Sequence, residues 1–154
     1  MKKSQATPSR DLDEVDLQII AGLRQDGRIS FAQLAKQLDV SPGMVRQRYL
    51  QMVEDGVLHV VAVTNPTLLG YNMMALIGVE VDGNRLEEVA HEISAFEEAT
   101  YVVVCTGIYD ILVEVNCRDN AHLLQFLTQR LRAVEGVRHT QTFTYLQIVK
   151  EVYF

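Results

Sequence analysis

SFAQLAKQLDVSPGMVRQRYLQMVEDGVL, residues 30–58, contains two helix starts separated by a tight turn. Ser30 followed three residues later by Gln33 is a capping-box pattern, in which each side chain satisfies a free backbone amide at a helix start. Ser41 followed by Pro42 is an N-cap serine with proline at the first helical position, which predicts a second helix start. Two capped helices at this spacing predict a helix-turn-helix.

The second predicted helix has an apolar face and a polar face. An advance of about 100° per residue puts on the core side Val45, Tyr49, Met52 and Val53. No carboxylate occurs between Asp39 and Glu54. In a DNA major groove, amides on the polar face reach base edges, and arginines at its two edges reach phosphates. The predicted DNA-binding residues are Ser41, Gly43, Met44, Arg46, Gln47, Arg48 and Gln51. Capped amphipathic helices also occur in hairpins that bind no nucleic acid, and this alternative stays open here.

The chain before residue 73 divides into three parts. Residues 1–10 are polar and predict a flexible arm. Residues 11–58 are interpreted as the helix-turn-helix domain, because Asp11 or Asp13 can cap a first helix that ends near residue 26. Residues 59–64, HVVAVT, are rich in β-branched valine and predict a strand, so residues 59–72 are interpreted as a wing or linker.

Residues 73–154 predict an α+β domain. The expected elements are strand 74–82, helix 85–97, strand 100–106, strand 109–117, helix 119–134 and strand 137–150. This βαββαβ order is typical of a ferredoxin-like domain, an antiparallel sheet with both helices on one face. The apolar residues assigned to the uncovered face are Val102, Val104, Ile111, Val113 and Val115. An uncovered apolar face predicts a homodimer packed sheet to sheet.

Charge is unevenly distributed along the 154 residues. Residues 1–58 contain eight Lys/Arg and eight Asp/Glu, whereas the rest contains six and twelve, which accounts for the net charge of -6. A local positive surface on the helix-turn-helix is therefore compatible with an acidic chain. No apolar run approaches the ~20 residues of a membrane span, and the opening MKKSQATPSRD lacks the apolar stretch of a secretory signal. These features predict a cytoplasmic protein.

The sequence gives little indication of a metal, a cofactor or catalysis. Cys105 and Cys117 lack CxxC or Cys/His spacing, so they are interpreted as free thiols, and neither a metal site nor a cofactor is predicted. His91, His122 and His139 are interpreted as surface histidines, because no nucleophile, base and orienting group accompany them. We expect no enzymatic activity.

Several short motifs occur in order along nearly the whole chain. They are Leu12-Asp13 with Asp16; Asp26-Gly27-Arg28-Ile29-Ser30; Val40-Ser41 through Val45 with Arg48, Gly56 and Val57; Asn65-Pro66 with Leu69, Gly70 and Tyr71; Gly107 with Tyr109 and Asp110; and Gly136-Val137 followed by Thr140, Thr142 and Thr144. Together they resemble the Lrp/AsnC, or feast/famine, family of bacterial and archaeal transcription regulators. The resemblance implies a winged helix-turn-helix that binds double-stranded DNA, followed by a domain that binds an amino acid or similar small effector. It also implies homodimers that assemble into octamers or other higher oligomers, with the effector near the contact between dimers.

The residues around Gly107 suit such an effector. Gly107 lies between two predicted strands, where a positive φ would let a ligand approach the backbone closely. Neighbouring amides can hold a carboxylate, while Asp110 can accept from an α-ammonium group. The predicted effector-binding residues are Gly107, Ile108, Tyr109, Asp110, Thr140 and Thr142. The alternative is a hairpin turn whose glycine is required by geometry and whose aspartate bonds the local backbone.

Two other functions stay open. A group of haem-pathway decarboxylases resembles the same architecture, but those enzymes have several arginines and histidines around the linker to hold an acidic tetrapyrrole, where this chain has only His59. An amino-acid sensor that has lost DNA binding is the second alternative, because Gly43-Met44 stands where the family has small hydroxyl residues.

Overall fold

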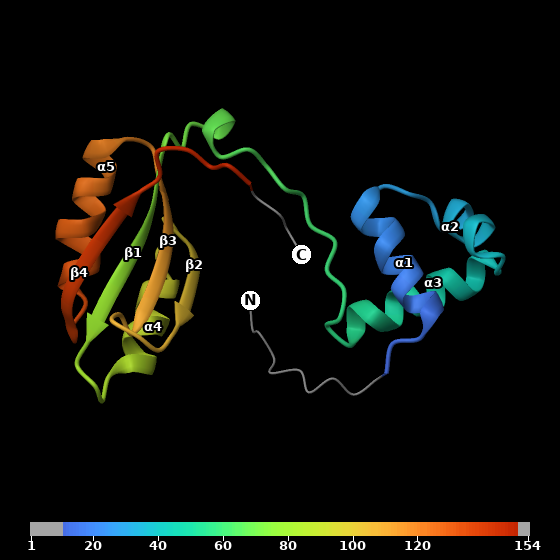
Figure 1. Cartoon of the computed structure of the whole chain (residues 1–154), viewed down its shortest axis with the longest axis horizontal. Coiled ribbons are helices and arrows are strands. Elements are labelled where there is room, and N and C mark those ends of the chain that lie inside the picture. Colours follow the sequence, from blue (N-terminus) through green and yellow to red (C-terminus); the bar gives the residue numbers. More distant parts are fainter. Residues whose placement is uncertain (1–10, 151–154) are drawn as a thin grey trace. The chain divides into compact units, whose positions relative to one another are not determined.

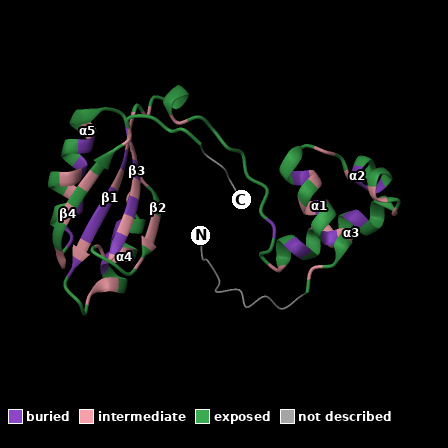
Figure 2. Cartoon of the chain, in the orientation of Figure 1, coloured by how far each residue is buried: buried purple, intermediate pink, exposed green. Residues whose placement is uncertain are grey.

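The computed structural model describes residues 11–150, so the arm predicted for residues 1–10 lies outside the described residues. The chain divides between Val63 and Thr64 into two compact units, each with its own core (Figures 1 and 2). No helix in the described part of the chain is long and apolar enough to cross a membrane.

The first unit consists of three helices, α1 (Glu14–Gln25), α2 (Phe31–Leu38) and α3 (Pro42–Glu54). Each begins where a side chain accepts a hydrogen bond from a free amide, namely at Asp13, Ser30 and Ser41. The two capping boxes are complete, since Asp16 and Gln33 bond back to their caps. The fully buried apolar side chains from all three helices are Ile19, Leu34, Val45 and Met52.

The turns between and after these helices confirm the predicted helix ends. Asp39 ends α2 in the left-handed conformation, with φ 53°, and the chain reaches the Ser41 cap two residues later. Gly56 follows α3 with φ 71°, a conformation that glycine adopts without steric cost. Val53, predicted on the core side, is instead 36% exposed near the end of α3.

The strand predicted for residues 59–64 is wrong. Residues 58–65 form no regular secondary structure, and the one element between α3 and β1 is a single 3₁₀ turn, Thr67–Leu69. β-Branched composition favours extended backbone, but a strand also needs a hydrogen-bonded neighbour, which this segment lacks within the described chain. Between residues 11 and 65, the helix-turn-helix therefore has no wing strand.

The second unit is a four-stranded antiparallel sheet with helices on one face (Figure 1). The elements follow the predicted βαββαβ order, as β1 (Met73–Val81), α4 (Leu86–Ser94), β2 (Ala99–Val104), β3 (Ile111–Cys117), α5 (Asn120–Gln125) and β4 (Val137–Thr144). The spatial strand order is β2-β3-β1-β4. A π-helical turn, Phe126–Arg130, and a 3₁₀ turn, Leu131–Ala133, continue α5. β4 ends at Thr144, so the strand predicted to residue 150 is six residues too long.

The register shows which residues share a face of the sheet. Ile77 of β1 lies opposite Val113 and Thr142, and Ile77 and Val113 are fully buried in the core that packs against the helices. Gly78, the next residue, lies opposite Leu112 and Gln141 on the uncovered face.

The apolar set predicted on the uncovered face is therefore wrong: Val102, Val104, Ile111, Val113 and Val115 all lie on the helix side. The uncovered face presents other large apolar side chains instead, which are Leu76, Tyr101, Val103, Leu112 and Phe143. Tyr101 and Phe143 are exposed, so this face still has the apolar surface that the dimer prediction requires.

Candidate functional site

The exposed face of α3 is the first candidate site. Six of the seven predicted DNA-binding residues are exposed there or at its start, which are Ser41, Gly43, Met44, Arg46, Gln47 and Gln51. The hydroxyl of Ser41 accepts from the Met44 amide at 3.2 Å, so its position is fixed by capping. The side-chain amide of Gln51 donates to the Asp55 carboxylate at 3.1 Å. Gln47 is the other predicted side-chain amide on this face, and it lies nearer the start of the helix.

Arg48, the seventh residue, points elsewhere. Its Nη1 donates to Asp16 Oδ1 at 3.1 Å and also to Asp13, and its side chain is only 25% exposed. Asp16 is fully buried. The guanidinium hydrogen-bonded to Asp13 holds the pKa of that carboxyl below its usual value. The edge position predicted for Arg48 is thus corrected: its charge is directed toward the carboxylates at the start of α1.

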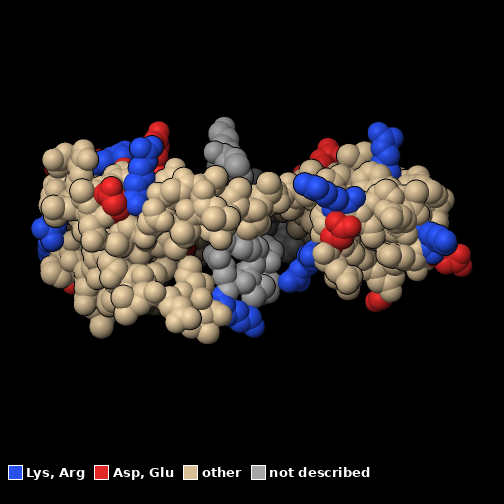
Figure 3. Space-filling model, turned by 90° about the horizontal axis from the view of Figure 1, so that it is seen from above, with Lys and Arg blue, Asp and Glu red and all other residues tan. Residues whose placement is uncertain are grey.

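The electrostatics of the exposed α3 face follow from composition and from this pairing. Arg46 lies in a stretch, residues 40–53, that contains no Asp or Glu. On the side seen in Figure 3, charged side chains form separate groups on a mostly uncharged surface.

The loop between β2 and β3 is the second candidate site. Gly107 has φ 147°, and a Cβ added there would meet no other atom within 4 Å. Ile108 is 82% exposed. Tyr109 folds back over the uncovered face of the sheet, where its ring packs at Gly78 and its hydroxyl bonds to Gln141.

Asp110 bonds the backbone, as the alternative interpretation expects. Its Oδ2 accepts from the Val81 amide at 2.8 Å, its own amide donates to Val79 at 3.0 Å, and its carbonyl accepts from Cys105 at 2.9 Å. Asp110 thus joins the end of β1 to the start of β3, and only the rest of its carboxylate can serve a ligand.

The two predicted threonines do not join this loop in one chain. Thr140 and Thr142 lie opposite Val79 and Ile77, on the helix side of the sheet, whereas Tyr109 covers the other side. Alternation along β4 causes this, because residues 140 and 142 share a face that excludes 141.

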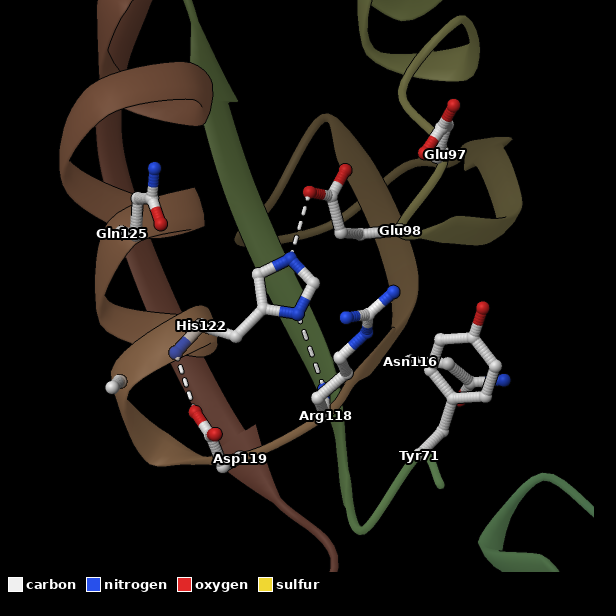
Figure 4. A pocket seen from close by; sticks show the side chains of 9 residues that line it. Tyr71, Glu97, Glu98, Asn116, Arg118, Asp119, His122 and Gln125 are labelled. Carbon is white, nitrogen blue, oxygen red and sulfur yellow. Dashed lines mark hydrogen bonds and ion pairs between the residues drawn. The ribbon is translucent and has the colours of Figure 1, made fainter. Parts of the chain in front are cut away.

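Sequence reasoning missed a buried ionic cluster at the far end of β3. Glu98, just before β2, is 7% exposed, and its carboxylate accepts from Arg130 at 2.6 Å and lies 3.1 Å from Nε2 of His122. Burial alone raises the pKa of Glu98, but its backbone amide, His122 and Arg130 outweigh burial and lower it. His122, predicted as a surface residue, lies half-buried in this cluster (Figure 4). No local sequence pattern predicts the cluster, because His122 and Arg130 lie 24 and 32 residues from Glu98.

Comparison with known proteins covers both units. Residues 12–53 match the AsnC-type helix-turn-helix domain, and residues 74–153 match the Lrp/AsnC ligand binding domain. An uncharacterized HTH-type transcriptional regulator of Pyrococcus furiosus is 34% identical over 132 residues, covering 85% of this chain and 89% of the relative. The HTH-type transcriptional regulator FL11 of the same organism is 32% identical over 141 residues, covering 91% and 93%.

Solved structures share the fold of more than nine-tenths of the chain. Escherichia coli AsnC superimposes with a TM-score of 0.88 at 25% identity, covering 94% of this chain and 99% of that one. A Neisseria meningitidis transcriptional regulator, solved as a complex with L-Met, gives a TM-score of 0.84 at 23% identity, covering 92% and 94%. The two matched domains, in this order and over this length, show that the chain belongs to the Lrp/AsnC family of DNA-binding transcriptional regulators.

Proposed function

We propose that the exposed α3 face is the DNA-reading surface of this regulator, and that it recognises specific sequences in double-stranded DNA. The observation that carries the proposal is an exposed helix face that starts at a capped turn and has no carboxylate of its own from Pro42 to Val53. Gln47 and Gln51 are assigned to base edges, Ser41, Gly43 and Met44 to the groove surface near the helix start, and Arg46 to phosphate. Arg48 is assigned to holding α3 against α1.

The uncovered face of the sheet supports the homodimer. Leu76, Leu112 and Phe143 form an apolar surface on which a second copy would exclude water. A two-fold dimer would present two α3 helices, so its target would be roughly palindromic, with half-sites about one helical turn apart or a multiple of it. Octamers or other higher assemblies remain part of the proposal by family resemblance.

The effector proposed for the Gly107 loop is an amino acid. The open backbone at Gly107 and the amides of Ile108 and Tyr109 suit a carboxylate, and the L-Met complex of the Neisseria relative is in keeping with this class. Because Thr140 and Thr142 lie on the opposite face of the sheet, we assign them to contacts with a Gly107 loop from another copy. A site shared between copies would couple effector binding to assembly.

A transcriptional regulator acts where the genome is, so we propose a cytoplasmic protein without catalytic activity. A haem-pathway decarboxylase would need a basic carboxylate clamp around the linker. No such group of basic side chains occurs in described residues 59–72, where His59 stands alone.

Selection of binding sites from random duplex DNA by the full chain tests the DNA-reading surface. We expect a roughly palindromic consensus, with binding weakened by Arg46→Ala and its sequence preference relaxed by Gln47→Ala. Arg138→Ala, which removes an exposed arginine from the sheet unit, is the matched control and should leave the consensus unchanged. Recovery of no consensus, or the same consensus and affinity with both α3 variants, would refute the assignment.

A further inference from the structure

A hollow of about 510 Å³ opens where β3 ends and α5 begins. It is lined by Tyr71, Glu97, Glu98, Asn116, Arg118, Asp119, Ala121, His122 and Gln125, all within the second unit (Figure 4). The Gly107 loop precedes β3, whereas Arg118 follows it. Since a strand rises about 3.3 Å per residue, the seven residues of β3 separate the two places by roughly 20 Å.

The floor of the hollow is rigid. Glu98 is held by Arg130 and His122, and His122 Nδ1 accepts from the Arg118 amide at 3.2 Å. The His122 amide in turn donates to Asp119 at 2.8 Å. No buried side-chain nitrogen or oxygen is left without a partner in the described part of the chain. A satisfied network of this kind fixes the positions of the groups above it.

The rim of the hollow includes the Arg118 guanidinium, which takes no part in the hydrogen bonds of the floor. Among the interactions found in residues 11–150, none engages the Arg118 guanidinium, while Arg85, Arg130 and Arg138 of the same unit are all in ion pairs. Figure 4 shows the Arg118 side chain projecting into the hollow between the His122 ring and Tyr71, below the Glu98 carboxylate. A guanidinium placed this way suits bidentate binding of a carboxylate.

Acceptors for a positive group lie on the other side of the same hollow. Glu97 is exposed at the rim above Glu98 (Figure 4). Glu98 Oε2 accepts from Arg130 alone, whereas Oε1 also faces His122, so Oε2 has capacity for one further donor. A simple anion would be repelled by these carboxylates, and a simple cation by Arg118. A zwitterion satisfies both.

We infer that this hollow is a binding site for α-amino acids, separate from the Gly107 loop. Arg118 binds the carboxylate, Glu97 and Glu98 Oε2 accept from the ammonium, and the amides of Asn116 and Gln125 contact the side chain. The ligand class rests on the proposed function, but the location does not. Tyr71 belongs to the segment that leads into β1, and the amide of Asn72 donates to Arg118 at 3.3 Å. A ligand in the hollow would therefore link the segment that contains Tyr71 to α5.

Hydrogen–deuterium exchange of the full chain, followed by mass spectrometry, tests this site without assuming an oligomeric state. Each of the twenty amino acids is added singly at millimolar concentration. We expect at least one to slow exchange in peptides covering residues 70–73 and 116–125. The carboxamide of the same amino acid, which lacks the carboxylate, should not slow exchange in these peptides. Its N-acetyl derivative, which lacks the ammonium, should not slow it either.

Arg118→Gln should weaken the protective amino acid about tenfold, the loss expected from removing one charge-assisted contact. Melting temperature should be unchanged in this variant, because the side chain is exposed. Arg132→Gln, an exposed arginine outside the hollow, is the matched control and should keep full protection.

The outcomes separate this site from the proposed effector loop. Protection confined to residues 104–111 would overturn the inference and leave the effector proposal standing. Protection of residues 116–125 that survives Arg118→Gln would also overturn it. Protection of neither segment by any amino acid would refute both, and protection of 70–73 and 116–125 alone would support this site against the loop.

Discussion

Arg48 of α3 donates a 3.1 Å hydrogen bond to the fully buried carboxylate of Asp16 in α1. The same guanidinium also bonds to Asp13, whose side chain caps α1. One arginine of α3 thus ties that helix to both acids at the start of α1. The contact holds α3 against α1, and under the proposed function Arg48 would affect DNA binding only by positioning this helix.

Arg48→Ala should lower the free energy of unfolding by about 2 kcal/mol, because the buried Asp16 carboxylate loses the charged hydrogen bond from Arg48. The partial exposure of Arg48 keeps this loss below that of a fully buried pair. Urea denaturation of the full chain measures it. Arg46→Ala, with an exposed side chain two residues away, should change stability by less than about 0.5 kcal/mol. Equal effects of the two substitutions would contradict the role given to Arg48.

The salt dependence of DNA binding distinguishes an arginine that positions α3 from an arginine that contacts a phosphate. Arg46→Ala should reduce the slope of log affinity against log salt concentration by about one, as loss of one phosphate contact does. Arg48→Ala should weaken DNA binding but keep the wild-type slope, because its charge is already paired within the protein. A reduced slope for Arg48→Ala, measured by fluorescence anisotropy, would return Arg48 to the phosphate-binding set.

Asp13 should make the stability of the protein depend on pH in the acid range. Arg48 and the Asp16 amide lower the pKa of Asp13 from its model-compound value of 3.8, so the unfolded chain binds its proton more readily. This stabilisation is therefore complete above the unfolded value and is lost as pH falls through the lower folded value. The stability advantage of wild type over Asp13→Asn should shrink as pH falls below about 4. A difference that stays constant from neutral pH to pH 3 would contradict the pairing.

The glycine beneath Tyr109 can be tested directly. A Cβ at Gly78 would lie 2.5 Å from two atoms of the Tyr109 ring, so Gly78→Ala should displace the ring and cost about 1–3 kcal/mol. Combining it with Tyr109→Ala should remove most of that extra cost in a double-mutant cycle. Gly83→Ala, where no atom lies within 4 Å, is the control. Additive losses in the double variant would mean that the ring is not what requires glycine.

The two cysteines should react at different rates. Burial, with the charges of Glu98 and Asp119, raises the pKa of Cys117 to about 11, whereas Cys105 is partly exposed. At pH 8, iodoacetamide should therefore modify Cys105 first and reach Cys117 only when the chain unfolds. Peptide mass spectrometry with and without urea measures this order. Rapid labelling of Cys117 in the native protein would contradict its burial.

Local features of the sequence predicted the helix-turn-helix well. Ser30 with Gln33 and Ser41 with Pro42 are short-range signals, and the structure places caps at both serines. The strand at residues 59–64 failed because valine content alone does not supply a pairing partner. β4 was extended too far for the same reason, since the pairing of this strand with β1 stops at Ala75 and Thr144.

Long-range relationships were beyond sequence reasoning. Alternation in Ile111, Val113 and Val115 gives the period of a strand but not the face that the helices cover. Arg48 and Asp16 are 32 residues apart, so only the packing of α1 on α3 reveals that this arginine is paired inside the protein. The Glu98 cluster and the opposite orientation of Thr142 likewise depend on how distant strands are aligned.

The most direct test of the central claim is the ratio of affinities for a selected site and for random duplex DNA, measured at one salt concentration. We expect Gln47→Ala to lower this ratio about tenfold or more, through loss of a base contact, while affinity for random DNA stays the same. An unchanged ratio in this variant, or a wild-type ratio near one, would contradict the claim that the exposed face of α3 reads DNA sequence.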